Sequence, residues 1–473
     1  MDQTLRTPAF PGDMDPEEFR HHGRAAVDWI AAYLREIERY PVLAQVQPGE
    51  IAAQLPVEAP EHGVPMEAIL ADFQRTLLPG ITHWNHPGFM AYFGITASGP
   101  GIVGEALAAA LNVNAMLWRT SPAATELEER ALDWLRQMIG MPAAFRGHIQ
   151  DTASLSTLVA IAGARESAGL DVREHGLAAL PRMRLYCSEE AHSSVEKAAI
   201  TLGLGRAGVR KIPTGDAFRM RVDALSAAIQ DDVVNGWRPF CVVATVGTTS
   251  TTSVDPVPEI AEVCARERLW LHVDAAYGGA VGVVPEMRHL LAGCDRADSL
   301  VVNPHKWLFV PIDCSALYLR RPESVRRAFS LVPDYLQTPE GDGVTNLMDY
   351  GPALGRRFRA LKLWMTLCYF GREGLAERIR EHCRLAREFA SWVDAEPGWE
   401  RMAPVPMSVV VFRRSGEDAL NETILERVNA SGEVFLSHTR VHGQYALRLA
   451  VGNLRTTQSH VARAWELLRK AQP

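Results

Sequence analysis

Residues 299–307 read SLVVNPHKW and place a lysine between an imidazole and an indole, just where an apolar run ends. Residues 300–302 have the character of a buried strand, and lysine is among the side chains least often buried. Two interpretations are open. Either Lys306 extends past His305 and Trp307 into water, or it is an amine held in a pocket with a lowered pKa, able to form a Schiff base.

Short apolar strands that end in polar or glycine-rich residues recur through residues 99–363. Strands are expected at 183–188, 240–247, 269–274, 299–302 and 314–320, and helical stretches such as 222–233 and 257–267 lie between several of them. Strands that alternate with helices predict an α/β fold with a mostly parallel central sheet covered on both faces. Sites in such folds lie at the carboxyl ends of the strands, which is where these polar residues fall.

Two smaller regions flank this α/β domain. The pair Asp15-Pro16 predicts the start of a helix whose apolar stripe needs a partner, and the chain up to residue 98 is rich in proline, histidine and glycine. We expect residues 1–98 to form an N-terminal helical dimerisation segment. Residues 364–473 contain helical stretches and the strands 408–414 and 446–451, which predict a small C-terminal α+β domain.

Composition argues against several classes of partner. The chain of 473 residues carries a net charge of -7 and no long basic run, which argues against nucleic acid or an anionic membrane as the partner. Its seven cysteines include no C-x-x-C pair, so neither a disulfide framework nor a metal site is expected. Because secretory features and long apolar stretches are missing, we expect a cytoplasmic protein.

Three more groups suit a cofactor, and two of them lie at predicted strand ends. Asp274 follows an apolar strand, where it either caps the next helix or pairs with a protonated heterocyclic nitrogen beside the small Ala276. A carboxylate for a pyridinium nitrogen and a lysine for an aldehyde are what pyridoxal phosphate (PLP) requires. Residues 150–154 precede an apolar helix and are either a plain cap or a phosphate cradle. His192 is either a satisfied loop residue or an imidazole that stacks on the cofactor.

Five motifs carry a resemblance to a known family. SPAATELE (121–128), AHSSVEKA (191–198), HVDAAYGG (272–279), NPHKW (303–307) and GRRFRALKLW (355–364) closely resemble the aromatic-L-amino-acid decarboxylases, in a bacterial-type form. These are group II PLP-dependent decarboxylases of the aspartate aminotransferase fold (fold type I). The likeness runs from about residue 14 to 470. It implies decarboxylation of an aromatic L-amino acid (tryptophan, phenylalanine, tyrosine or DOPA class) by a homodimer with its site at the subunit interface.

The resemblance implies a role for each matching residue. Lys306 would carry PLP as a Schiff base, Asp274 would keep the pyridine nitrogen protonated, His192 would stack on the ring, and Tyr335 would donate a proton to the product. The cofactor would also contact Ala153, Ser154, Thr248, Ala276, Asn303 and His305. Relatives that form aldehydes tend to lack this tyrosine or this histidine, so the pair favours a decarboxylase over an aldehyde synthase.

The resemblance also predicts the substrate pocket, formed by Trp84, Tyr92, Phe93, Thr96, Met116, His192 and Gly355. An aromatic wall favours indole or phenyl rings over a charged tail, so tryptophan or phenylalanine-type substrates are favoured. Two departures reshape the wall: Gly94-Ile95 stands where animal relatives have one proline, and Met116 stands where they have a phenylalanine from the other subunit. An aromatic aldehyde synthase, a glutamate or cysteine-sulfinate decarboxylase, and a PLP-binding protein without turnover stay open as alternatives.

Overall fold

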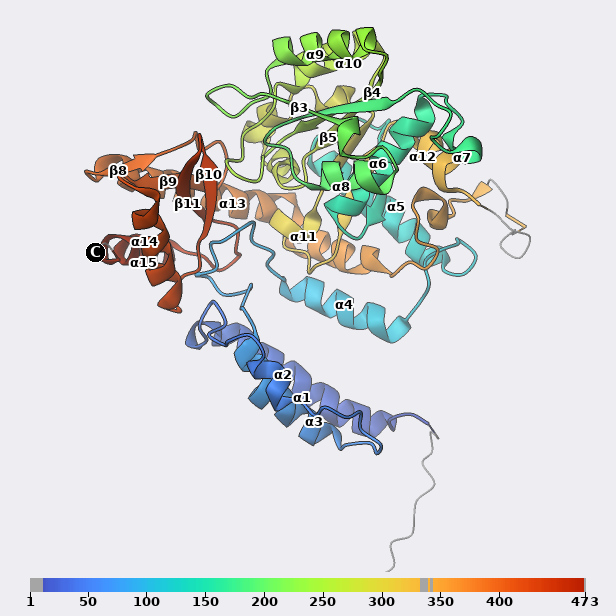
Figure 1. Cartoon of the computed structure of the whole chain (residues 1–473). Helices are drawn as coiled ribbons and strands as arrows, with labels where there is room; N and C mark the ends of the chain where they lie inside the picture. Colours follow the sequence, from blue (N-terminus) through green and yellow to red (C-terminus); the bar gives the residue numbers. More distant parts are fainter. Residues whose placement is uncertain (1–11, 332–338, 341–342, 472–473) are drawn as a thin grey trace, which may run out of the picture.

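The computed structural model describes residues 12–331, 339–340 and 343–471, and its large domain is built on a seven-stranded sheet (Figure 1). The spatial order of the strands is β1-β7-β6-β5-β4-β2-β3. Their bounds are β1 (Arg146–Gln150), β2 (Met183–Ser188), β3 (Val209–Ile212), β4 (Arg238–Thr245), β5 (Trp270–Asp274), β6 (Ser299–Val302) and β7 (Ser315–Leu319). Strand β7 is antiparallel to both of its neighbours and the other pairs are parallel, which confirms the predicted α/β class.

The central strands are buried at every position, because helices cover both faces of the sheet. All residues of β5, β6 and β7 are buried, in keeping with their unbroken apolar runs. The register pairs Thr245 with Asp274, and Asp274 with Val301, so the carboxyl ends of β4, β5 and β6 lie level at one edge. The covering helices include α5 (Pro122–Met138), α6 (Ala153–Ser167), α8 (Ser194–Thr201), α9 (Val222–Val234), α10 (Val257–Glu267) and α12 (Pro322–Phe329).

The C-terminal part forms a separate layer, drawn in orange and red in Figure 1. Its antiparallel sheet has the order β10-β11-β9-β8. Its elements are α13 (Arg359–Ala395), β8 (Trp399–Arg401), β9 (Val409–Arg414), α14 (Asp418–Ala430), β10 (Ser437–Val441), β11 (Gln444–Ala450) and α15 (Gln458–Lys470). The expected boundary at residues 363/364 falls inside α13. This helix is kinked at Gly371, where φ is 60°. This helix therefore belongs to both domains.

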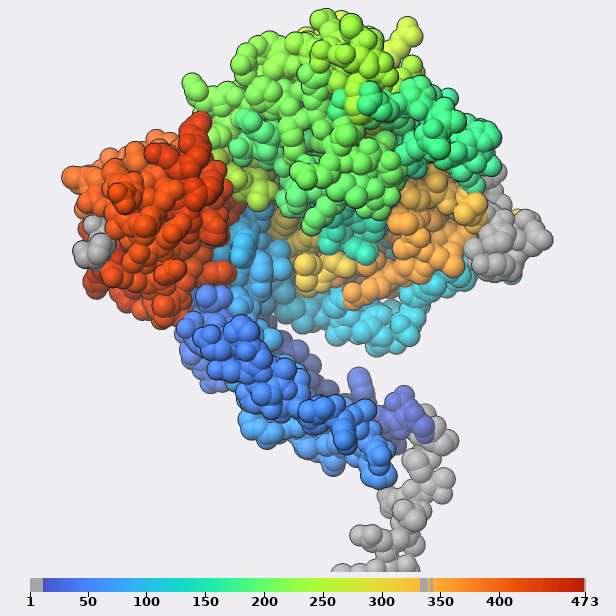
Figure 2. Space-filling view, in the orientation of Figure 1, coloured from blue at the N-terminus to red at the C-terminus, as the bar shows by residue number. Residues whose placement is uncertain are grey.

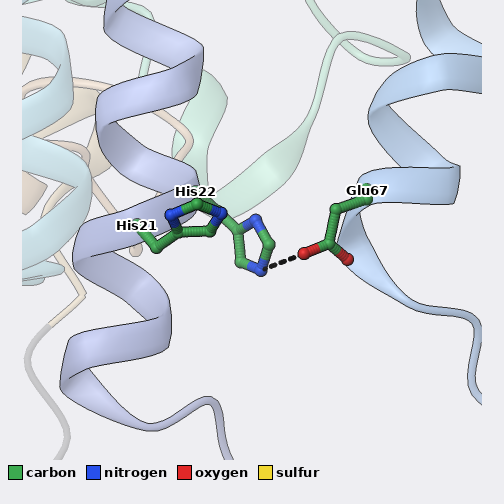
Figure 3. A group of neighbouring side chains, drawn as sticks. All are labelled: His21, His22 and Glu67. Atoms are coloured by element: carbon green, nitrogen blue, oxygen red, sulfur yellow. Dashed lines mark ion pairs between the residues drawn. The ribbon is translucent and has the colours of Figure 1, made fainter.

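The N-terminal segment is a helical arm that projects from the body of the molecule (blue in Figures 1 and 2). It contains α1 (Pro16–Arg35), α2 (Glu50–Gln54) and α3 (Met66–Asp72), and Asp15 caps α1 by accepting the Glu17 N–H at 2.9 Å. His22 joins α1 to α3 through Glu67, with Nε2 and Oε1 3.6 Å apart, and His21 lies beside it (Figure 3). The arm continues into α4 (Gly99–Leu111), which packs on α13.

Close packing of α4 on α13 depends on a glycine. A Cβ at Gly104 would lie 2.7 Å from the Cα of Lys362, so a larger residue would push the helices apart. Helix α4 also exposes apolar side chains four residues apart, at Val103, Leu107 and Leu111. None of the helices described here is long and apolar enough to cross a membrane.

Candidate active site

Side chains from five strand ends converge on one cavity of about 190 Å³ at the carboxyl edge of the sheet. The cavity is lined by Phe93, Thr152, Ala153, Ser154, His192, Thr245, Gly247, Thr249, Asp274, Ala276, Tyr277, Asn303, His305 and Lys306. A larger depression of about 780 Å³ lies between α5 and residues 343–350, but its lining contains no lysine. The groups predicted to hold the cofactor therefore meet in the smaller cavity, with one exception among them, Thr248.

Lys306 reaches the cavity from a single helical turn, α11 (Pro304–Trp307), which follows β6 directly. The backbone N–H of Lys306 donates to the Asn303 carbonyl at 2.9 Å, and Nζ lies 5.1 Å from the ring centroid of Phe93. Burial lowers the pKa of the Lys306 amine; Asp274 opposes this shift and the guanidinium of Arg448 adds to it. The lowered pKa increases the uncharged fraction of the amine, which is the nucleophilic form.

Asp274 is the last residue of β5 and is buried. Its Oδ1 accepts the Ala276 N–H at 3.1 Å, and the small side chain of Ala276 lines the cavity beside it. Asp274 therefore stabilises its own turn with one backbone hydrogen bond, and it also faces the cavity, where a carboxylate can hold a protonated ring nitrogen.

His192 enters from the bend between β2 and α8. Its Nδ1 accepts the Ser194 N–H at 3.2 Å and lies 2.9 Å from Ser194 Oγ. Burial lowers the pKa of His192, while Asp274 raises it and Lys306 lowers it further. Because Nδ1 accepts a backbone hydrogen bond, the neutral ring carries its proton on Nε2.

The N-terminus of α6 forms the base of the cavity. Thr152 is the N-cap in an extended conformation (φ -133°, ψ 166°), and Ala153 and Ser154 begin the helix. The first N–H groups of a helix have no helical acceptor, so they bind anions readily. Within the described part of the chain, Asn303 Oδ1 and Thr245 Oγ1 are buried without a hydrogen-bond partner. These donors and unpaired polar atoms, together with Lys306 and Asp274, fit a flat phosphorylated aldehyde such as PLP.

Thr248 does not line this cavity. Its hydroxyl lies 3.0 Å from Thr251 Oγ1 and accepts the Ser253 N–H at 3.0 Å, so the side chain closes its own turn. The neighbouring residues Gly247 and Thr249, with Thr245, line the cavity in its place. A motif match could not show which threonine of TVGTTS points inward.

Most of the expected substrate-pocket residues lie outside the cavity of a single chain. Trp84 stacks on Phe89 with ring centroids 4.2 Å apart, and Tyr92 is 53% exposed. Thr96 is buried with its hydroxyl unpartnered among the described residues, and Met116 packs near Leu117 and Met348. Gly355 is exposed, and a Cβ at this position would have no atom of the described residues within 4 Å. Only Phe93 and His192 of this set line the cavity, and Tyr335 lies outside the described residues.

Arg448 is a functional candidate that the sequence analysis missed. It lies in β11, is 3% exposed, and its guanidinium carbon lies 4.8 Å from the Phe93 ring centroid. It donates to the carbonyls of Tyr92 and Ser250, and Nη2 has no partner among the described residues. Burial lowers the pKa of Arg448 to about 10. A signal was present, since an arginine within the apolar run ALRLAV is as unexpected as Asp274 at the end of LWLHV.

Comparisons with known proteins agree with this geometry. The pyridoxal-dependent decarboxylase conserved domain matches residues 48–415. The chain is 41% identical over 471 residues to an aromatic-L-amino-acid decarboxylase of Sus scrofa, covering 96% of each sequence. It superposes on Catharanthus roseus tryptophan decarboxylase in complex with L-tryptophan with a TM-score of 0.91, at 37% identity over 97% of this chain and 98% of that one. A 4-hydroxyphenylacetaldehyde synthase of Rhodiola rosea gives 0.90 at 34% identity over the same shares.

Proposed function

Because the chain belongs to the aromatic-L-amino-acid decarboxylases, a family of pyridoxal-dependent enzymes, we propose that the cavity around Lys306 is its catalytic site. The protein is a carboxy-lyase that uses PLP to convert an aromatic L-amino acid into its arylalkylamine and CO2. The observation that carries the assignment of the site is the convergence of Lys306 and Asp274. They face one cavity from the ends of adjacent strands, beside the N-terminus of α6.

Each part of the cofactor has a matching group in the cavity. Lys306 would hold the aldehyde carbon, Asp274 would hold the protonated ring nitrogen, and His192 would cover one face of the ring. The N–H groups of Ala153 and Ser154 would bind the phosphate, and the remaining contacts would come from Thr245, Ala276, Asn303 and His305. When bound, PLP supplies an electron sink for the electron pair that the departing carboxyl group leaves.

The protein's own contribution is to orient groups and to exclude water. The stacked rings of Phe93 and Tyr277, with centroids 3.9 Å apart, form an apolar wall, and burial lowers the pKa of the lysine amine. Orientation of the substrate so that only its carboxyl bond can break is worth several kcal/mol, on the order of the effects known for positioned reactants. Arg448 places a buried positive charge near this wall, where an anionic substrate group can be held.

We propose that Tyr335 donates the proton that the α-carbon receives after CO2 leaves. This residue lies outside the described residues, and the proposal rests on the family motif and on the presence of His192 in the same chain. Loss of this proton donor would favour the aldehyde product, which is the reaction named for the Rhodiola rosea relative. Amine as the product is therefore the outcome that Tyr335 and His192 together favour.

A homodimer accounts for the residues that a single cavity leaves unused. The exposed apolar side chains of α4 and of α1, including Leu107 and Phe19, support a second subunit against the arm. We propose that Trp84, Tyr92, Thr96, Met116 and Gly355 complete the substrate pocket at this interface. The aromatic substrate class is supported by the tryptophan complex of the Catharanthus roseus relative. We also propose a cytoplasmic location, which suits seven unpaired cysteines.

Reduction with borohydride tests the assignment of the site. The PLP-loaded protein is reduced and digested, and we expect the pyridoxyl label on Lys306 alone. Lys306→Ala is expected to lose the label, the visible absorbance of the bound cofactor and amine formation, whereas Lys470→Ala, a control at an exposed lysine of α15, keeps all three. A label on another lysine, or amine formation by Lys306→Ala at the wild-type rate, would refute the assignment.

A further inference from the structure

Three buried rings, those of Trp307, Tyr277 and Phe93, form a stack near Lys306. Trp307 directly follows Lys306 and is fully buried. Its indole lies parallel to Tyr277, with centroids 4.5 Å apart and planes 5° apart, and Tyr277 in turn stacks on Phe93 at 3.9 Å. Phe93 is the ring that lies 5.1 Å from Lys306 Nζ. The stack therefore runs from the chain neighbour of Lys306 to a ring that lies 5.1 Å from its amine.

His382, which lies in α13, forms a hydrogen bond with the indole of Trp307. Trp307 Nε1 donates to His382 Nδ1 at 2.9 Å, and His382 Nε2 lies 3.0 Å from the Asn453 carbonyl oxygen. An indole N–H can only donate, so Nδ1 must be the acceptor and Nε2 must carry the proton. Burial lowers the pKa of His382 to about 4, which keeps the ring in this neutral form near neutral pH.

The imidazole is itself fixed from the C-terminal domain. Asn453 is fully buried after β11, and its side-chain amide donates to the carbonyls of Trp84 at 3.2 Å and His86 at 3.0 Å. His382 therefore joins α11, α13 and the segment after β11 through two hydrogen bonds. The two bonds satisfy both ring nitrogens of this buried imidazole and fix its orientation, which an apolar residue could not do.

We propose that His382 is a positioning residue for Lys306. Its hydrogen bond to Trp307 holds the single turn of α11, and with it the lysine amine, against Phe93 and toward the cavity. The inference rests on the proposed function, in which Lys306 is the lysine that bonds to PLP. It goes beyond that function because His382 touches neither the cavity nor its ligands, and acts through Trp307.

The pKa of Lys306 gives a readout that simple loss of stability would not change. The charged or titratable groups that face Lys306 are Asp274, Arg448, His192 and His305. None of them is altered when His382 is replaced. Burial is the largest cause of the lowered pKa, so a lysine released from its place gains water and its pKa rises toward the ordinary value.

The test compares variants of the apoenzyme by the pH at which they capture added PLP. His382→Leu removes the acceptor, and we expect the midpoint of the capture rate to move up by about one pH unit. We expect kcat to fall about tenfold while KM for the aromatic amino acid changes by less than about twofold. His382→Asn, which places an amide oxygen close to the position of Nδ1, is expected to restore most of both. His148→Leu is the matched control, a buried histidine outside the stack whose ring nitrogens have no hydrogen-bond partner among the described residues.

A double-mutant cycle shows whether the effect passes through Trp307. Trp307→Phe keeps a ring in the stack but removes the N–H, so it should shift the midpoint in the same direction as His382→Leu. This second variant keeps the test possible if His382→Leu does not fold. In the Trp307→Phe background, His382→Leu should add nothing further. An unchanged midpoint in both single variants, or fully additive shifts, would overturn the proposal. If the borohydride label lies on another lysine, the proposed function fails; if it lies on Lys306 and the midpoint is unmoved, only this inference fails.

Discussion

Three charged side chains in or beside the cavity lie within apolar runs of the sequence or directly after them. Lys306 and Asp274 stand directly after buried runs, and both could be identified from the sequence because an isolated charge there needs a specific partner. Arg448 is likewise an isolated charge in the apolar strand β11, but its functional role was not predicted from the sequence. Its strand belongs to the C-terminal domain, and sequence spacing does not show that this strand packs against a ring of the large-domain cavity.

The carboxylate of Asp274 has two effects that can be separated by Asp274→Asn. Turnover should fall on the order of a hundredfold or more, because the ring nitrogen of the cofactor loses its anionic partner. In the apoenzyme the pKa of Lys306 should fall further, since Asp274 is the group that raises it. Steady-state kinetics and the pH dependence of PLP capture measure these two effects. Asp232→Asn, at a buried carboxylate paired with Arg184, is the control, and unchanged turnover in Asp274→Asn would contradict the pairing.

At the scale of elements, the sequence predicts strands that are buried on both faces and misses those at the edges of the sheet. The strands β2, β4, β5, β6 and β7 were all predicted from their apolar runs. The missed strands β1 and β3 are the two edge strands of the seven-stranded sheet. Strand β1 has the sequence RGHIQ, in which only three residues are buried. The turn α11 was also missed, because four residues carry no helical period.

The N-terminus of α6 allows a test of the phosphate cradle without loss of the helix. Proline is tolerated at the first helical position, and Thr152 before it already has the extended conformation that proline requires. Ala153→Pro removes one N–H donor, so we expect PLP affinity to fall about tenfold, measured by equilibrium titration of the apoenzyme. Gln458→Pro makes the same change at the start of α15 and should leave the affinity unaltered. Equal affinities in all three proteins would exclude this N–H as a ligand.

At the scale of the whole molecule, five buried histidines make stability depend on pH. Burial lowers the pKa of His148 to about 3, and lowers those of four others to about 4: His86, His272, His305 and His382. Between these values and the ordinary pKa of about 6.5, the unfolded chain binds more protons than the folded one. Stability should therefore be full above about pH 6.5 and fall as the pH drops, by about 1.4 kcal/mol per pH unit for each histidine.

Calorimetry in buffers of different ionisation enthalpy measures the protons taken up on unfolding. At pH 5, we expect His148→Leu to take up about one proton fewer than the wild type, because one neutral buried imidazole has been removed. Equal uptake by the two proteins would show that His148 is charged in the folded state.

The exposed stripe of α4 tests the proposed assembly. Leu107 is 48% exposed in the single chain, between Val103 and Leu111 on the same face. We expect the wild type to sediment at twice 52.2 kDa, and Leu107→Glu to shift toward the monomer and lose activity in parallel. Val234→Glu, at an apolar position on α9 that is 86% exposed, should stay dimeric and active. A monomeric wild type with full activity would show that the site is complete in one subunit.

Product analysis shows whether this cavity decarboxylates aromatic amino acids. Purified, PLP-loaded protein is offered tryptophan, phenylalanine, tyrosine, DOPA, histidine and glutamate in parallel, and amine, aldehyde, hydrogen peroxide and CO2 are measured. We expect amine and CO2 in equal amounts from the aromatic acids and no product from glutamate. Amine from glutamate, or aldehyde with hydrogen peroxide from the aromatic acids, would show that the site catalyses a different reaction.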